Sequence, residues 1–116
     1  MQRLTNNHIG ITQGSRVLFS DYIDDGPMWT GTGPREHRFT VEFEERYVAV
    51  PNVMTSISMW DSDTKTNQRM DISAENISEG GFDLVFRTWG DSRVARVRAN
   101  WIVIGPLPNE DDWELY

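Results

Sequence analysis

Three consecutive residues, Trp89, Gly90 and Asp91, place a large indole beside a glycine and a carboxylate at a predicted turn. This turn separates two alternating runs, FDLVFR before it and ARVRANWIVIG after it. A ring at such a position has no core to enter, so its surface is free to contact a ligand. Two structural roles remain open: Trp89 covers the hairpin end or packs on a neighbouring subunit, and Asp91 is an ordinary turn residue.

No other cluster in the sequence has the spacing of a catalytic or metal site. The two histidines, His8 and His37, are placed neither for metal ligation nor for a nucleophilic triad. The chain contains no cysteine, which excludes disulfides, thiolate zinc sites and cysteine nucleophiles. The segment GTGP at 31–34 runs into charged residues, and DSDTKTN at 61–67 lacks the glycine and distal glutamate of a calcium loop. We therefore expect no enzyme activity, no cofactor and no metal.

Charge and hydropathy exclude two further classes of partner. The formal net charge of -7 would repel a nucleic-acid backbone over most of the surface. Four arginines within one hairpin could form a basic stripe, but nearby Asp83 and Asp91 neutralise it, so we expect no nucleic-acid binding. No apolar run approaches the ~20 residues that cross a bilayer, and MQRLTNNHIG does not resemble a signal peptide. We expect no membrane insertion, and the compartment, cytoplasm or a phage-like particle, stays open.

The elements that must position the turn are β-strands. Apolar and polar residues alternate over 39–44, 55–60, 70–75, 82–89 and 95–103, and one or two more strands fit 9–20. Turn signals separate these runs at 24–27, 31–34, 61–67, 78–81 and 89–92. We predict an all-β sandwich or barrel as one domain over 1–105. An acidic tail over 106–116 follows, which Trp113 and Tyr116 could dock onto the domain.

The polar faces of the predicted strands mix carboxylates, arginines and small hydroxyls. Two interpretations are open: a solvated surface, or a symmetric subunit contact in which serines allow close approach and arginines pair with a neighbour's carboxylates. The residues concerned are Glu42, Ser56, Ser58, Asp71, Ser73, Arg96, Arg98 and Asn100.

From Arg38 to Gly105 the sequence resembles the H-type lectin domain family, of the snail agglutinin and discoidin C-terminal type. The anchors that carry the resemblance, in consistent register, are Phe43, Tyr47, Pro51, Val53, Asp61, Arg69, Gly81, Phe82, Thr88, Trp89 and Trp101. The resemblance implies a six-stranded antiparallel β-sandwich that assembles as a trimer, sometimes as a hexamer of two stacked trimers. It also implies calcium-free binding of galactose-type sugars, notably N-acetylgalactosamine, in shallow sites between subunits. A hexamer linked through cysteine is excluded.

The resemblance gives the turn at 89–91 a function. A sugar offers a patch of C–H groups and a rim of hydroxyls, so Trp89 would supply an aromatic surface and Asp91 hydrogen-bond acceptors. Gly90 would leave room above the ring, and Arg69, at the position of the family's binding arginine, would donate to sugar oxygens. A subunit salt bridge is the alternative role of Arg69. Trp29, Trp60 and Trp101 are expected to be packing residues.

The sequence departs from the family's pattern at three places around the expected sugar. Ala95 stands where the snail protein has a sugar-contacting tyrosine, and Gly90 where it has a histidine. The upstream loop that brings another carboxylate is shorter here, and Gly33, Arg35 or Glu36 would take its place. We predict a non-enzymatic, multivalent carbohydrate-binding module. The alternative is a structural or attachment module of a larger, phage-like assembly that binds no sugar. In that alternative the acidic tail makes the contact with the partner.

Overall fold

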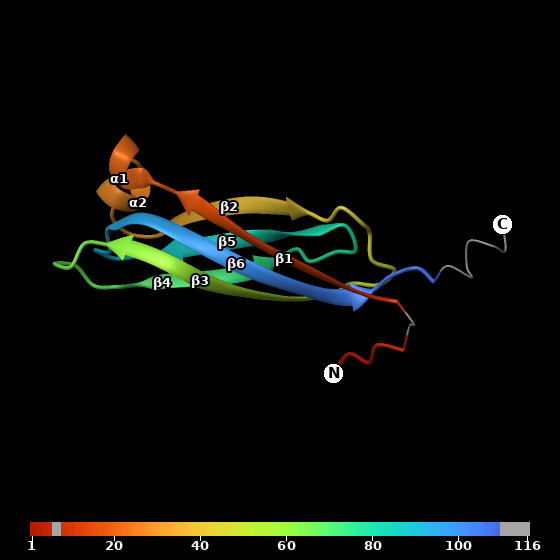
Figure 1. Cartoon of the computed structure of the whole chain (residues 1–116). Coiled ribbons are helices and arrows are strands. Elements are labelled where there is room, and N and C mark those ends of the chain that lie inside the picture. Colours follow the sequence, from red (N-terminus) through yellow and green to blue (C-terminus); the bar gives the residue numbers. More distant parts are fainter. Residues whose placement is uncertain (6–7, 110–116) are drawn as a thin grey trace.

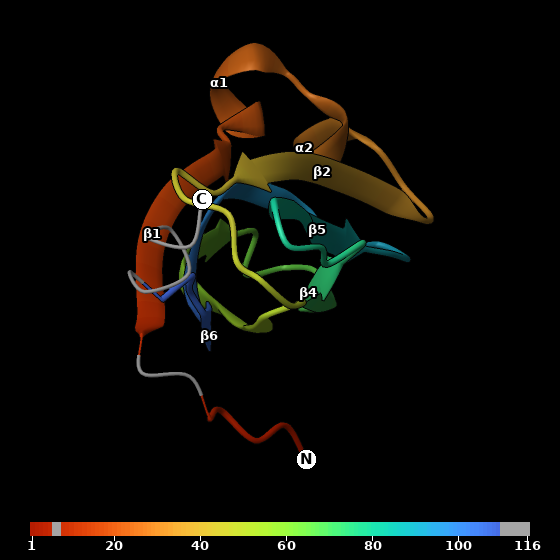
Figure 2. The same cartoon turned by 90° about the vertical axis from the view of Figure 1, so that its right-hand side faces the viewer.

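Alternating residues leave one apolar face on each predicted strand, and two such faces must cover one another. The computed structural model describes residues 1–5 and 8–109, and in this part the strands form two antiparallel sheets (Figures 1 and 2). The prediction of an all-β sandwich is confirmed. The elements are β1 (Ile9–Phe19), α1 (Asp21–Asp24), α2 (Pro27–Thr30), β2 (Arg35–Glu42), β3 (Asn52–Ser62), β4 (Met70–Glu75), β5 (Gly81–Thr88) and β6 (Val94–Pro106).

Each sheet has three strands, in the order β1-β6-β3 in one and β2-β5-β4 in the other. The central strands, β5 and β6, hold most of the core because they are flanked on both sides and covered by the opposite sheet. Their fully buried side chains include Leu84 and Phe86 on β5 and Val97 and Val103 on β6. The strand β6 ends at Pro106, and the predicted docking of Trp113 and Tyr116 lies outside the described residues.

The two short helices were not predicted, because four residues cannot display a helical period. They fill the connection between β1 and β2, where the sequence showed turn signals. The carboxylate of Asp21 accepts a hydrogen bond from the backbone N–H of Met28 at 2.9 Å, which ties α1 to α2. Met28 is buried, so the connection is anchored to the core.

The predicted packing role of tryptophan is confirmed at two of three positions. Trp101 meets Phe82 edge to face at 6.2 Å between ring centroids, and Gly14 on the paired strand leaves room for its ring. Trp29 is half-buried between Tyr22 and the guanidinium of Arg93. Trp60, by contrast, is 60% exposed near the end of an edge strand, where the opposite sheet does not cover it, so its predicted packing within the chain is wrong.

The outer faces of the two sheets differ in character. On the outer face of β2-β5-β4, Arg38 and Arg87 pair with Glu36, Glu75 and Asp83 at 2.6–3.6 Å. The outer face of β1-β6-β3 instead exposes large apolar side chains, among them Ile11 at 64% and Met54 at 65%. The polar residues predicted to share one kind of surface are therefore divided between a charged face and a face that mixes polar groups with large apolar side chains.

Candidate functional site

Three connections that are far apart in the sequence meet at one end of the sandwich. They are the β5–β6 turn (89–93), the β3–β4 connection (63–69) and the segment between α2 and β2 (31–34). Figure 1 shows α1 and α2 at this same end, with the N-terminal segment and the end of β6 at the other. Backbone hydrogen bonds join the connections: the N–H of Gly33 donates to the carbonyl of Gly90 at 2.9 Å, and the N–H of Asp63 to that of Arg93 at 2.9 Å.

The carboxylate of Asp91 is the centre of a small polar cluster. The Nη1 atom of Arg69 lies 2.7 Å from its Oδ1, and the side-chain amide of Asn67 donates to both oxygens. The hydrogen bond from Asn67, helped by the charge of Arg69, holds the pKa of Asp91 below its usual value. Arg69 and Asp91 remain 39% and 53% exposed, so a ligand in solvent can reach the pair.

Buried hydroxyls hold the backbone beneath this cluster. The Oγ of Ser92 accepts a hydrogen bond from the N–H of Arg69 at 3.0 Å and donates to the carbonyl of Asn67. The Oγ1 of Thr88 donates to the carbonyl of Arg69 at 2.6 Å. Sequence reasoning missed the roles of Asn67 and Ser92, because their contacts cross between connections and leave no local pattern.

Gly90 is needed for the geometry of the turn. Its φ of 67° lies in the left-handed region, which glycine adopts without steric cost. A Cβ atom at this position would come within 3.1 Å of Nη1 of Arg69. The glycine therefore allows the arginine to lie against the turn that carries Trp89 and Asp91.

Arg35 is engaged by backbone carbonyls. Its guanidinium donates to the carbonyls of Gly33 at 2.9 Å, Met28 at 3.1 Å and Gly90 at 3.2 Å. Burial lowers the pKa of this group, although not enough to remove its charge. Arg35 thus joins the end of α2 to the β5–β6 turn, and Gly33, with a φ of 74°, turns the chain between them.

Trp89 itself is 43% exposed. It forms one wall of a groove of about 390 Å³, whose other lining residues are Pro34, Arg35, Glu36, Arg87 and Thr88. The structure therefore brings all six predicted site residues to one region. Trp89, Gly90, Asp91 and Arg69 form its surface, and Arg35 and Gly33 support it through the carbonyl of Gly90.

Residues 1–5 and 8–109 contain no group of three or more histidine, cysteine or acidic residues placed to hold a metal ion. His37 lies against the ring of Phe19, 5.7 Å between centroids, away from the cluster around Asp91. Within the same residues, no helix has the length and hydropathy to span a membrane.

A two-sheet antiparallel sandwich with aromatic and charged side chains on its end connections is a β-sandwich domain with a candidate binding site. Residues 38–104 match the sequence profile of the H-type lectin domain, so the chain belongs to the H-type lectin domain family. At the level of this family it is a carbohydrate-binding lectin. The predicted family membership is confirmed.

Three similar proteins are compared with this chain. The chain is 57% identical over 107 residues to the ATP synthase subunits region ORF 7 of Fuscovulum blasticum, covering 92% of this chain and 93% of that one. It is 35% identical over 80 residues to a discoidin-1 chain of Dictyostelium discoideum, covering 68% of this chain but 32% of the discoidin. The structure of discoidin II from the same organism superposes with a TM-score of 0.74 at 24% identity, over 90% of this chain and 40% of that one, which shows a shared fold.

Proposed function

We propose that this protein is a multivalent lectin that binds galactose-type and N-acetylgalactosamine-type glycans around Trp89, without catalysis. The observation that carries the proposal is the fixed pair of Arg69 and Asp91, in which Asp91 stands two positions after the exposed Trp89 on the same turn. A pyranose needs one apolar surface and a few oriented donors and acceptors, and this end of the sandwich offers both.

Each residue has a distinct part in the proposed complex. Trp89 contacts the C–H face of the sugar. Among the described residues, Arg69 pairs with Asp91 through Nη1, which leaves the N–H groups of Nε and Nη2 for the ring oxygen or an axial hydroxyl oxygen. Asp91, whose two oxygens already accept from Arg69 and from the side-chain and backbone N–H groups of Asn67, orients the arginine, and a sugar hydroxyl would replace one of the longer hydrogen bonds from Asn67.

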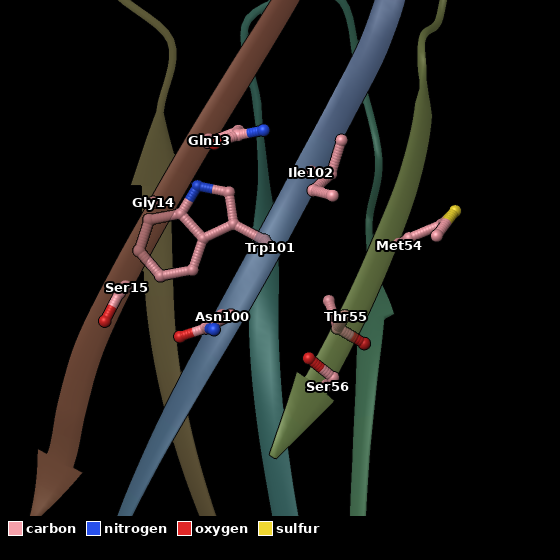
Figure 3. A pocket seen from close by; sticks show the side chains of 9 residues that line it. All are labelled: Gln13, Gly14, Ser15, Met54, Thr55, Ser56, Asn100, Trp101 and Ile102. Atoms are coloured by element: carbon pink, nitrogen blue, oxygen red, sulfur yellow. The ribbon is translucent and has the colours of Figure 1, made fainter. Parts of the chain in front are cut away.

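We also propose that the protein acts as a homotrimer whose subunits meet on the outer face of β1-β6-β3. On this face Ile9, Ile11, Val17 and Met54 are 46–65% exposed, which is typical of a subunit contact rather than of a solvated sheet. The middle of the face holds a shallow hollow of about 470 Å³ in which Gln13, Ser15, Ser56 and Asn100 are flanked by Met54 and Ile102 (Figure 3). Amide and hydroxyl groups there can pair across a symmetric contact.

Trimerisation would give the lectin its useful affinity. A single exposed site on a sandwich end binds a sugar weakly, because a shallow surface excludes little water. Three sites held on one assembly engage several sugars of one glycan surface at once, and the second and third contacts form at a high effective concentration. In the proposed trimer, each site lies near a boundary between two subunits.

The experiment is a glycan array probed with the purified protein and its Trp89→Ala variant, after the mass of each in solution has been measured. We expect a trimer that binds galactose-type glycans, and a trimeric variant that does not. A wild-type trimer that binds no glycan would contradict the proposed lectin activity and favour the attachment module. Binding that survives in the variant would move the site away from Trp89.

A further inference from the structure

We propose that the groove on the β2 side of Trp89 is a second sugar subsite. It would take the next residue of a glycan whose terminal sugar binds on the Arg69 side of the same indole. This inference rests on the proposed lectin function and deepens it: the ligand is a glycan of at least two pyranose rings, and a single sugar fills only half of the site.

The sheet order places Trp89 between the two subsites. Strand β5 lies between β2 and β4, and its last residue, Thr88, pairs with Arg35 on one side and Met70 on the other. The next residue, Trp89, is consequently flanked by the chain before β2 and by the chain before β4. The groove with Pro34 lies on the first side and Arg69 on the second.

The groove has the surface that a neutral, hydroxyl-rich ring requires. Its walls include the ring of Trp89 and Pro34, and its polar groups include Glu36 and Arg87, whose Oε1 and Nη2 atoms are 2.9 Å apart. These two side chains are 43% and 38% exposed. One accepts hydrogen bonds and the other donates them, while the guanidinium of Arg35, which also lines the groove, is bound to backbone carbonyls, so sugar hydroxyls find both an acceptor and a donor.

The groove is held in place before any ligand binds. Arg87 also pairs with Glu75 at 2.6 Å, and Glu36 lies 3.6 Å from Arg38, so both polar groups belong to a larger network. On the opposite wall, Arg35 is held by the carbonyls of Gly33, Met28 and Gly90. Groups that are already ordered lose little entropy on binding, which favours an affinity gain from a second ring.

The network supplies a matched pair of variants. Glu36→Gln removes a carboxylate that lines the groove, whereas Glu75→Gln removes one that contacts the same two arginines outside it. In each variant both arginines keep at least one carboxylate partner, so each is expected to fold. Thermal unfolding checks this. The probes are the methyl glycoside of N-acetylgalactosamine and a panel of disaccharides that carry this residue at the non-reducing end, titrated calorimetrically.

We expect the best disaccharide to bind about tenfold more tightly than the methyl glycoside. Glu36→Gln should lose most of this gain, while Glu75→Gln should retain it. Equal affinity for all probes, or equal effects of the two variants, would overturn the second subsite. A Glu36→Gln variant that also loses the methyl glycoside would overturn it too, because the groove would then be the primary site. If the wild type binds no probe, the proposed function itself fails.

Discussion

Nη1 of Arg69 lies 2.7 Å from Oδ1 of Asp91, although the two residues stand on different connections, 22 positions apart. Gly90 makes this approach possible, because any larger residue would bring a Cβ atom within 3.1 Å of the same nitrogen. The contact between Arg69 and Asp91 therefore depends on the backbone conformation of the turn as well as on their opposite charges. It fixes a donor against the turn that carries Trp89, while Arg69 and Asp91 both stay accessible.

Trp89→Ala should remove the main contact surface for the sugar. We expect glycan affinity to fall by about 30-fold, or ~2 kcal/mol, because a buried indole at the centre of a contact carries much of its energy. Titration with an immobilised glycan measures the loss. Trp60→Ala removes an even more exposed indole outside the groove and should leave binding unchanged. Equal losses in both variants would contradict the assignment of Trp89.

The titration of Asp91 predicts the pH range over which the site works. Its pKa is lowered in the folded chain, so the ionised form and its pairing with Arg69 are fully present above the usual carboxyl pKa. They are lost as the pH falls through the lowered value. Glycan binding should therefore be constant between about pH 5 and about pH 8 and decline only in stronger acid. Binding isotherms over this range and in stronger acid test the prediction, and Asp91→Asn should weaken binding wherever the wild-type carboxylate is ionised.

Arg35→Lys should loosen the segment before β2. A lysine keeps the charge but cannot donate to carbonyls of three residues in a fixed plane, so we expect the free energy of unfolding to fall by about 2 kcal/mol. Urea denaturation measures this change. Arg46→Lys is the control, since that side chain is 70% exposed and pairs with Glu79 alone among the described carboxylates; it should cost less than about 1 kcal/mol. A similar small effect at Arg35 would show that its hydrogen bonds are replaced by water.

Ile11→Glu should dissociate the proposed trimer. The substitution puts a charge on the outer face of β1-β6-β3, beside its exposed apolar side chains, where a subunit contact would desolvate it. Sedimentation in the ultracentrifuge should show monomers. The matched variant is Ile23→Glu on α1, at a side chain that is 76% exposed but outside that sheet face, and it should stay trimeric. A trimeric Ile11→Glu variant would exclude this face as the contact.

Gly14→Ala should destabilise the sandwich through overpacking. A Cβ atom there would lie 2.1 Å from Cζ2 of Trp101, so the ring or the strand must move, at an expected cost of about 3 kcal/mol. Gly33→Ala is the comparison: no atom lies within 4 Å of its Cβ, and only its positive φ opposes the change, for about 1 kcal/mol. Thermal unfolding should rank the two in this order. A larger loss of stability in Gly33→Ala than in Gly14→Ala would mean that the ring of Trp101 moves aside at little cost.

The strands were predictable because alternation is a local property. The run at 70–75 coincides with β4, the runs at 39–44 and 82–89 overlap β2 and β5, and the long run at 95–103 lies within β6. The helices α1 and α2 were not predictable, since each has four residues. The exposure of Trp60 was not predictable either. The alternation of apolar and polar residues does not show where a strand extends past the end of the opposite sheet.

The sequence by itself determined that the chain is an all-β domain of the H-type lectin family and that an indole, a glycine and a carboxylate share one turn. Only the tertiary structure decided that Asn67 and Arg69 hold Asp91, that Arg35 is bound to backbone carbonyls, and that a groove lies beside Trp89. The reason is physical. Strand formation follows from neighbouring residues, whereas these contacts depend on sheet order and on hydrogen bonds between distant connections, which become favourable only once the two sheets have packed.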